Sequence, residues 1–120
     1  MLDSDTSFDL DPRWLSADPF YLDALENDPL AFVDADGAPL ARELDKAWDR
    51  FGAELPKLAV PTLAVHGVND PISPIGAVRA YAEQIDPLRI KEFDGAHDIL
   101  NETAHREVAA AIIEFVNSSI

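Results

Sequence analysis

The chain has 120 residues, of which 48% are hydrophobic, and its net charge is −14. This length allows one modest domain, and the composition is that of a globular protein rather than a disordered one. Residues 1–56 hold 14 acidic and 4 basic side chains, so most of the negative charge lies in the first half. Such a surface keeps a protein soluble and is repelled by phosphates and anionic membrane faces, so we expect no nucleic-acid partner.

Residue types that are absent or wrongly spaced exclude several kinds of site. Cysteine is absent, which excludes disulfides and thiolate metal sites. His66, His97 and His105 do not form an HxxxH or HExxH pattern, so no metal is expected. No apolar run approaches the roughly 20 residues of a membrane helix, and Met1 is followed by acidic residues where a secretory signal would be basic. We therefore expect a cytoplasmic protein without stable membrane insertion.

The first half of the chain is predicted to be mainly helical. Residues 1–12 show no regular period and are expected to form a connecting segment. A first helix should begin with Asp18 as its cap and Pro19 at its first position, and it should stop before Pro29.

A polar turn, "DADGAP", then leads to a longer amphipathic helix. Its apolar residues recur at the helical period and form one stripe. The stripe consists of Leu40, Leu44, Ala47, Trp48, Phe51 and Leu55. We expect this stripe, with its two aromatic side chains, to be buried.

After Pro56 the sequence alternates between strand and helix patterns. The apolar run "LAVPTLAVHG" predicts a buried strand that Pro61 can only open. "SPIGAVRAYAEQI" predicts a helix with Ser73 as its cap and Pro74 at its first position. "LRIKEF" predicts a more polar edge strand, "GAHDILNE" a loop, and "TAHREVAAAIIEFVNSS" the last helix.

This order of elements over residues 58–117 predicts an α/β fold with two parallel strands and flanking helices. A strand as apolar as residues 59–66 needs neighbours on both edges, and the sequence encodes only one. We therefore expect an incomplete sheet. The chain divides into a helical segment, residues 1–56, and a strand-helix-strand-helix part, residues 57–120.

Two residues with catalytic potential follow the two predicted strands. Asp70 lies just past the end of the first strand, and His97 lies just past the end of the second. Because ligands gather at the carboxyl ends of parallel strands, both residues should lie on the same rim, close enough for a hydrogen bond. A carboxylate in that position fixes the tautomer of the imidazole and stabilises the imidazolium, as in the acid and base of an acyl-transfer triad.

The residues around this pair carry a resemblance to a known family. "PTLAVHGVND" fits the pattern P-x-L-x-x-H-G-x-x-D with Asp70 at the acid position, and "FDGAHDILNE" places His97 at the position of the family histidine. From about residue 14 to residue 117 the chain resembles the C-terminal part of an α/β-hydrolase, in particular the monoacylglycerol lipase or lysophospholipase-like group. The resemblance implies that residues 1–56 form a cap and that no cofactor is needed.

The nucleophile of that family has no counterpart in the sequence. The family serine stands in a G-x-S-x-G elbow upstream of the acid and the base. The serines of this chain all lie outside such a context: Ser4, Ser7, Ser16, Ser73, Ser118 and Ser119. Loss of the serine costs on the order of 10⁶ in turnover, so the isolated chain should be inactive.

We therefore interpret the chain as a C-terminal fragment of a serine hydrolase. It supplies the acid and the histidine of a Ser-His-Asp triad, and an N-terminal hydrolase segment or a second chain completes the sheet. The expected substrate is a carboxylic ester, monoacylglycerol- or lysophospholipid-like, and the acidic surface favours a neutral one. Two alternatives stay open: epoxide, haloalkane or C–C hydrolysis on the same fold, and a non-catalytic truncated protein that functions by pairing with another chain.

Structural roles are the alternative for each candidate residue. Asp70 also fits a turn aspartate before Pro71, and His97 fits a loop histidine that bonds its own backbone. His66 is expected to contact a backbone carbonyl, and His105 is expected to be solvated.

Two polar residues of the last loop and four aromatic residues from the first half of the chain complete the set of candidates. Asn101 and Glu102 are interpreted as capping residues of the last helix. Aromatic side chains could line an acyl pocket or belong to the core: Trp14, Phe20, Trp48 and Phe51.

Overall fold

The structure is a computed structural model that describes residues 11–31 and 38–119. Residues 34–37 of the turn expected at "DADGAP" and most of the connecting segment expected over residues 1–12 lie outside these ranges, and the last two residues of "DADGAP" begin α2 instead. The α-helices are α1 (Pro19–Glu26), α2 (Ala38–Glu54), α3 (Ile75–Ala82) and α4 (His105–Ser119), and the strands are β1 (Thr62–Gly67) and β2 (Leu88–Phe93). Short 3₁₀ turns occur at η1 (Pro12–Trp14), η2 (Leu55–Lys57) and η3 (Ile99–Asn101).

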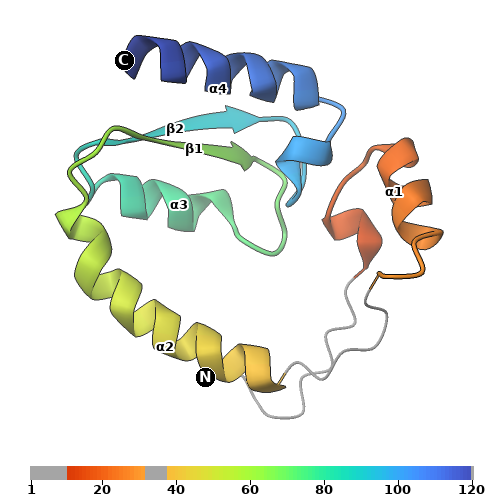
Figure 1. Ribbon diagram of the computed structural model, residues 1–120, viewed down its shortest axis with the longest axis horizontal. Helices are drawn as coiled ribbons and strands as arrows, with labels where there is room; N and C mark the ends of the chain where they lie inside the picture. Colours follow the sequence, from red (N-terminus) through yellow and green to blue (C-terminus); the bar gives the residue numbers. More distant parts are fainter. Residues whose placement is uncertain (1–10, 32–37, 120) are drawn as a thin grey trace.

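The described residues form an α/β fold around a two-stranded parallel sheet. β1 and β2 pair in register from Thr62 opposite Leu88 to Gly67 opposite Phe93. Helix α4 covers one face of the sheet, and α3 lies on the other (Figure 1). The predicted fold class and the parallel pairing of the two strands are thus confirmed.

One edge of β1 carries no partner strand among the described residues. The N–H of Thr62 donates to Pro87, and the N–H of Val68 donates to Phe93, so the even-numbered residues of β1 face β2. Because successive residues of a strand point to opposite sides, the backbone groups of Leu63 and Val65 face the open edge. The sheet is therefore open, and β1 is only partly buried, whereas its apolar sequence predicted a buried strand.

The hydrophobic core lies between α4, η3 and the sheet. It consists of Phe93, Ile99, Val108 and Ala111, with Val65, Ala104 and Ile112 packed against it. Val108 is fully buried in this core. Near the C-terminal end of α4 Val116 is 47% exposed, because the sheet is only two strands wide.

Helix α2 presents the two aromatic side chains of its apolar stripe to solvent, which corrects the prediction that they are buried. Trp48 is 55% exposed and Phe51 is 43% exposed, and their rings pack against each other edge to face with centroids 6.1 Å apart. The physical reason is that α2 contacts mainly the η2 turn that follows it and runs apart from the sheet (Figure 1). The segment is helical as its period predicted, but no described element buries these two rings.

The helix starts follow the cap residues with one exception. Asp18 accepts a hydrogen bond from the N–H of Phe20 and caps α1, as predicted. Helix α3, however, begins at Ile75 with Pro74 as its N-cap, and Ser73 makes no side-chain cap there. The backbone N–H of Ser73 donates instead to the carboxylate of Asp70. Among helices within the described ranges, none has the length and apolarity needed to cross a membrane.

Candidate active site

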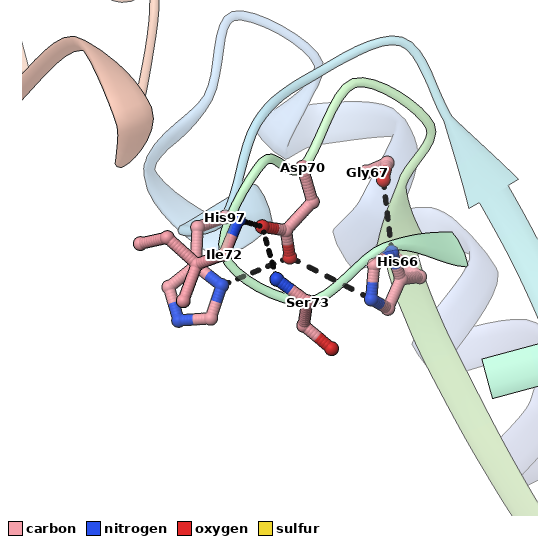
Figure 2. Close-up of polar contacts among 6 residues, drawn as sticks. All are labelled: His66, Gly67, Asp70, Ile72, Ser73 and His97. Atoms are coloured by element: carbon pink, nitrogen blue, oxygen red, sulfur yellow. Dashed lines mark hydrogen bonds and ion pairs between the residues drawn. The ribbon is translucent and has the colours of Figure 1, made fainter. Parts of the chain in front are cut away.

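The two candidate residues lie together at the carboxyl ends of the strands. Asp70 follows β1 in a short loop before α3, and His97 follows β2 in the loop that leads through η3 to α4. The Nδ1 atom of His97 lies 2.9 Å from Oδ2 of Asp70, at hydrogen-bond distance (Figure 2). The expected contact between these side chains is therefore present.

Asp70 uses its two carboxylate oxygens for different purposes. Oδ1 accepts hydrogen bonds from the backbone N–H groups of Ile72 (2.8 Å) and Ser73 (2.9 Å), and Oδ2 faces His97. The first pair of bonds forms the turn that the structural alternative predicted for this aspartate. The turn also fixes the direction of the carboxylate, so the structural role and the contact with His97 occur together.

The electrostatics of Asp70 favour its charged form. Its side chain is only 2% exposed, and this burial is the largest influence on its pKa and raises it. The hydrogen bonds from Ser73, His97 and Ile72 outweigh the burial, and their net effect lowers the pKa below its ordinary value. The carboxylate therefore stays ionised beside the imidazole at neutral pH.

His97 presents one ring nitrogen to Asp70 and leaves the other free. Because an ionised carboxylate only accepts hydrogen bonds, the contact assigns the hydrogen to Nδ1 and a lone pair to Nε2. Nε2 points away from Asp70 (Figure 2), and the side chain is 41% exposed. The imidazole therefore presents its second nitrogen outward from the rim.

His66 lies on the other side of the same carboxylate. Its Nδ1 atom is 2.8 Å from the carbonyl oxygen of Gly67, which confirms the predicted contact with a backbone carbonyl. Its Nε2 atom lies 3.6 Å from Oδ2 of Asp70, beyond hydrogen-bond distance. His66 therefore lies beside the carboxylate of Asp70, and His97 is the histidine that is hydrogen-bonded to this carboxylate.

Gly67 allows the two loops to meet. A Cβ atom at this position would overlap the carbonyl oxygens of Gly95 and Ala96, which are backbone atoms that cannot move aside cheaply. The N–H of Asn69 donates to Gly95, so the segment after β1 continues to pair with the segment after β2. This close approach brings the Asp70 loop against the His97 loop.

The sequence interpretation missed the buried pair formed by Ser16 and Glu102. Glu102 is 1% exposed and Ser16 is fully buried, and the Ser16 hydroxyl donates to Oε1 of Glu102 at 2.6 Å. Glu102 is therefore not an exposed capping residue as predicted, because its carboxylate binds a segment 86 residues away. A contact over such a separation leaves no local sequence signal. The backbone carbonyl of Glu102 accepts a hydrogen bond from Nδ1 of His105. His105 is exposed, as expected.

The two aromatic candidates nearest the N-terminus are exposed. Trp14 is 45% exposed and Phe20 is 87% exposed, so neither belongs to the core. Within residues 11–31 and 38–119 no group of three or more metal-ligating side chains is arranged to hold an ion.

The open parallel sheet, with a hydrogen-bonded acid and histidine on the loops after its strands, is the arrangement of an α/β-hydrolase. Residues 4–104 match the family model described as serine aminopeptidase, S33, so the chain belongs to this α/β-hydrolase family. The fold is also similar to the crystal structure of Paleococcus ferrophilus monoacylglycerol lipase, with a TM-score of 0.82 and 27% sequence identity. The match covers 96% of this chain and 46% of the lipase, so the chain spans about half the length of that protein.

Proposed function

We propose that this chain provides the acid and the general base of a serine hydrolase that cleaves carboxylic esters. Asp70 is the acid, His97 is the base, and the nucleophilic serine comes from another segment or from a second chain. The observation that carries the proposal is the 2.9 Å contact between Nδ1 of His97 and Oδ2 of Asp70, with Nε2 free at the carboxyl ends of the strands. With a serine in front of Nε2, this pair supports acyl transfer from a carboxylic ester.

In the proposed reaction Nε2 of His97 takes the hydroxyl proton as the serine oxygen attacks the ester carbonyl carbon. Asp70 holds the ring and stabilises the imidazolium that forms. The imidazolium then gives this proton to the departing alkoxide, and the C–O bond of the ester breaks to leave an acyl-serine. Water deprotonated by His97 attacks the acyl carbon, the carboxylic acid leaves, and the proton returns to the serine.

The open edge of β1 is the proposed attachment point for the missing part of the sheet. The backbone groups of Leu63 and Val65 face this edge, and an unpaired strand edge accepts a further strand through main-chain hydrogen bonds. We propose that an N-terminal hydrolase segment or a second chain pairs here and brings the serine. Residues 57–120 then form the C-terminal part of the core, and residues 1–56 form the cap.

Two observations support a neutral, lipid-like ester as substrate. The net charge of −14 disfavours anionic substrates. The similar structure from Paleococcus ferrophilus is that of a monoacylglycerol lipase. We therefore propose a monoacylglycerol- or lysophospholipid-like ester that carries no net negative charge.

A chimera tests the proposal directly. In this chimera, called the completed hydrolase below, the present chain replaces the segment of the Paleococcus ferrophilus monoacylglycerol lipase to which it aligns. We expect hydrolysis of a p-nitrophenyl ester and of a monoacylglycerol by the completed hydrolase, and loss of both activities in its His97→Gln variant. A completed hydrolase that melts cooperatively but cleaves neither ester, or a His97→Gln variant of undiminished activity, would contradict the proposal.

A further inference from the structure

The backbone around His97 is held by the N-terminal segment of the described chain, outside the sheet. The N–H of His97 donates to the carbonyl of Trp14 (3.1 Å), and the N–H of Asp98 donates to the carbonyl of Leu15 (2.7 Å). The loop that carries the imidazole is therefore paired with residues that precede it by more than eighty positions. The segment that contains them, red in Figure 1, lies beyond the arrowheads of β1 and β2.

The two residues that follow Leu15 bind a buried carboxylate from the same loop. The hydroxyl of Ser16 (2.6 Å) and the N–H of Ala17 (2.5 Å) both donate to Oε1 of Glu102. Ser16 also accepts from the N–H of Asp18, so its hydroxyl is fixed on both sides. Glu102 is thus the side chain that anchors the Trp14–Leu15 segment against the His97 loop.

The Glu102 side chain also packs beneath the backbone that precedes His97. A Cβ atom on Gly95 would lie 2.5 Å from Cγ of Glu102 and 2.5 Å from Cδ1 of Ile99, so the loop backbone rests directly on these two side chains. Glu102 has an exposed fraction of 1%, and its two donors both bind Oε1, which fixes the orientation of the carboxylate. Glu102 is therefore held by Ser16 and Ala17 on one side and packs against the loop backbone at Gly95 on the other.

We propose that Glu102 is a positioning residue for His97. It holds the segment Trp14–Ala17 in place, that segment holds the backbone of His97, and the backbone sets the distance between Nδ1 of His97 and Asp70. The inference rests on the proposed function of His97 as the base. It assigns to Glu102 a role beyond stability, namely the choice of tautomer at the imidazole.

The proposal has a spectroscopic consequence in the chain as it stands. While the Asp70 contact holds, neutral His97 carries its hydrogen on Nδ1. If the anchor is lost, the loop shifts, the contact with Asp70 lengthens, and the ring redistributes its hydrogen between Nδ1 and Nε2. ¹⁵N NMR of the ring nitrogens reports this tautomer without any need for catalysis.

The test compares Glu102→Gln and Ser16→Ala with Glu107→Gln, which alters an exposed carboxylate in the first turn of α4. In Glu102→Gln and Ser16→Ala we expect a smaller fraction of the Nδ1–H tautomer at His97 and about tenfold faster amide exchange at His97 and Asp98. Glu107→Gln should match the unsubstituted chain in both respects. If Glu102→Gln does not fold, Ser16→Ala decides the result, because it removes only one hydroxyl.

An unchanged tautomer and unchanged exchange in the folded variants would overturn the positioning role. That outcome would leave the proposed function standing, since the roles of His97 and Asp70 are tested by the activity of the completed hydrolase. Conversely, an inactive completed hydrolase would contradict the function while the tautomer shift could still be present. The two failures are therefore distinguishable.

Discussion

At the scale of single residues, the site depends on one carboxylate that serves two structures at once. Oδ1 of Asp70 holds the turn through Ile72 and Ser73, and Oδ2 faces Nδ1 of His97. A substitution that keeps the shape of this side chain and removes its charge separates the two roles. Asparagine still accepts at Oδ1, but its amide nitrogen cannot accept the hydrogen from Nδ1 of His97.

We predict that Asp70→Asn in the completed hydrolase lowers kcat by about 10⁴ while KM changes little, because the imidazole is held in the wrong tautomer. Steady-state ester hydrolysis measures this effect. Asp94→Asn is the matched control, since Asp94 is an exposed carboxylate nearby that accepts from the Asn69 side chain, and an amide oxygen can replace it there. Equal activity of Asp70→Asn and Asp94→Asn would remove Asp70 from the mechanism.

The lowered pKa of Asp70 predicts how stability depends on pH. Its ordinary value is 3.8 and its value in the folded chain is lower, so the ionised carboxylate stabilises the fold above pH 3.8. This stabilisation is lost as the pH falls below 3.8 and through the lower folded pKa. Urea unfolding between about pH 2 and pH 6 should therefore show a flatter acid limb for Asp70→Asn than for the unsubstituted chain. Parallel curves for the two proteins would contradict this prediction.

At the scale of elements, a side-chain hydrogen bond joins α1 to the loop after β2. The hydroxyl of Tyr21 donates to Oδ2 of Asp98 at 2.8 Å, and Asp98 is the residue that follows His97 in sequence. Burial, followed by the hydrogen bond and the negative charge of Asp98, raises the pKa of Tyr21 to about 12. Helix α1 is therefore tied to the same loop as the Ser16 and Glu102 pair.

We predict that ultraviolet titration of the chain shows a phenolate step at about pH 12 that is absent in Tyr21→Phe. In Asp98→Asn the step should move toward the ordinary value of 10.0, because the negative charge beside the hydroxyl is gone. If the phenolate step of Tyr21 occurs at the same pH in Asp98→Asn as in the unsubstituted chain, α1 does not rest on this loop in solution. The measurement compares the pH of the phenolate step in the unsubstituted chain with that in each of the two variants.

Elements governed by local chemistry were predictable from the sequence, and those governed by distant partners were not. The Asp18 cap, the strand that opens after Pro61 and the helical period of α2 each depend on neighbouring residues, and the structure contains all three. The burial of Trp48 and Phe51 depends on a partner element, and the structure leaves them exposed.

The same distinction applies to the site. Asp70 and His97 could be placed together because the carboxyl ends of parallel strands share one edge of a sheet. Glu102 could not be assigned, because its partners Ser16 and Ala17 belong to the other end of the chain. A buried carboxylate in a loop has the same local sequence context as an exposed one, and only the folded arrangement distinguishes them.

At the scale of the whole molecule, the chain has the fold of its family, and one edge of the sheet has no partner strand among the described residues. It aligns to 46% of the lipase structure, and β1 offers the backbone of Leu63 and Val65 along an edge that is unpaired within the described ranges. Asp70 and His97 are in hydrogen-bond contact, whereas no serine of the sequence stands in a G-x-S-x-G elbow. The central proposition is that this pair activates a serine supplied by the missing part of the sheet.

Labelling with a fluorophosphonate probe, followed by mass spectrometry to locate the modified residue, tests that proposition most directly. We predict no labelling of the chain alone. In the completed hydrolase we predict modification of one serine in the lipase-derived part, and loss of this modification in His97→Gln. Labelling of Ser16, Ser73 or any other serine of this chain by itself, or labelling of the completed hydrolase that does not depend on His97, would contradict it.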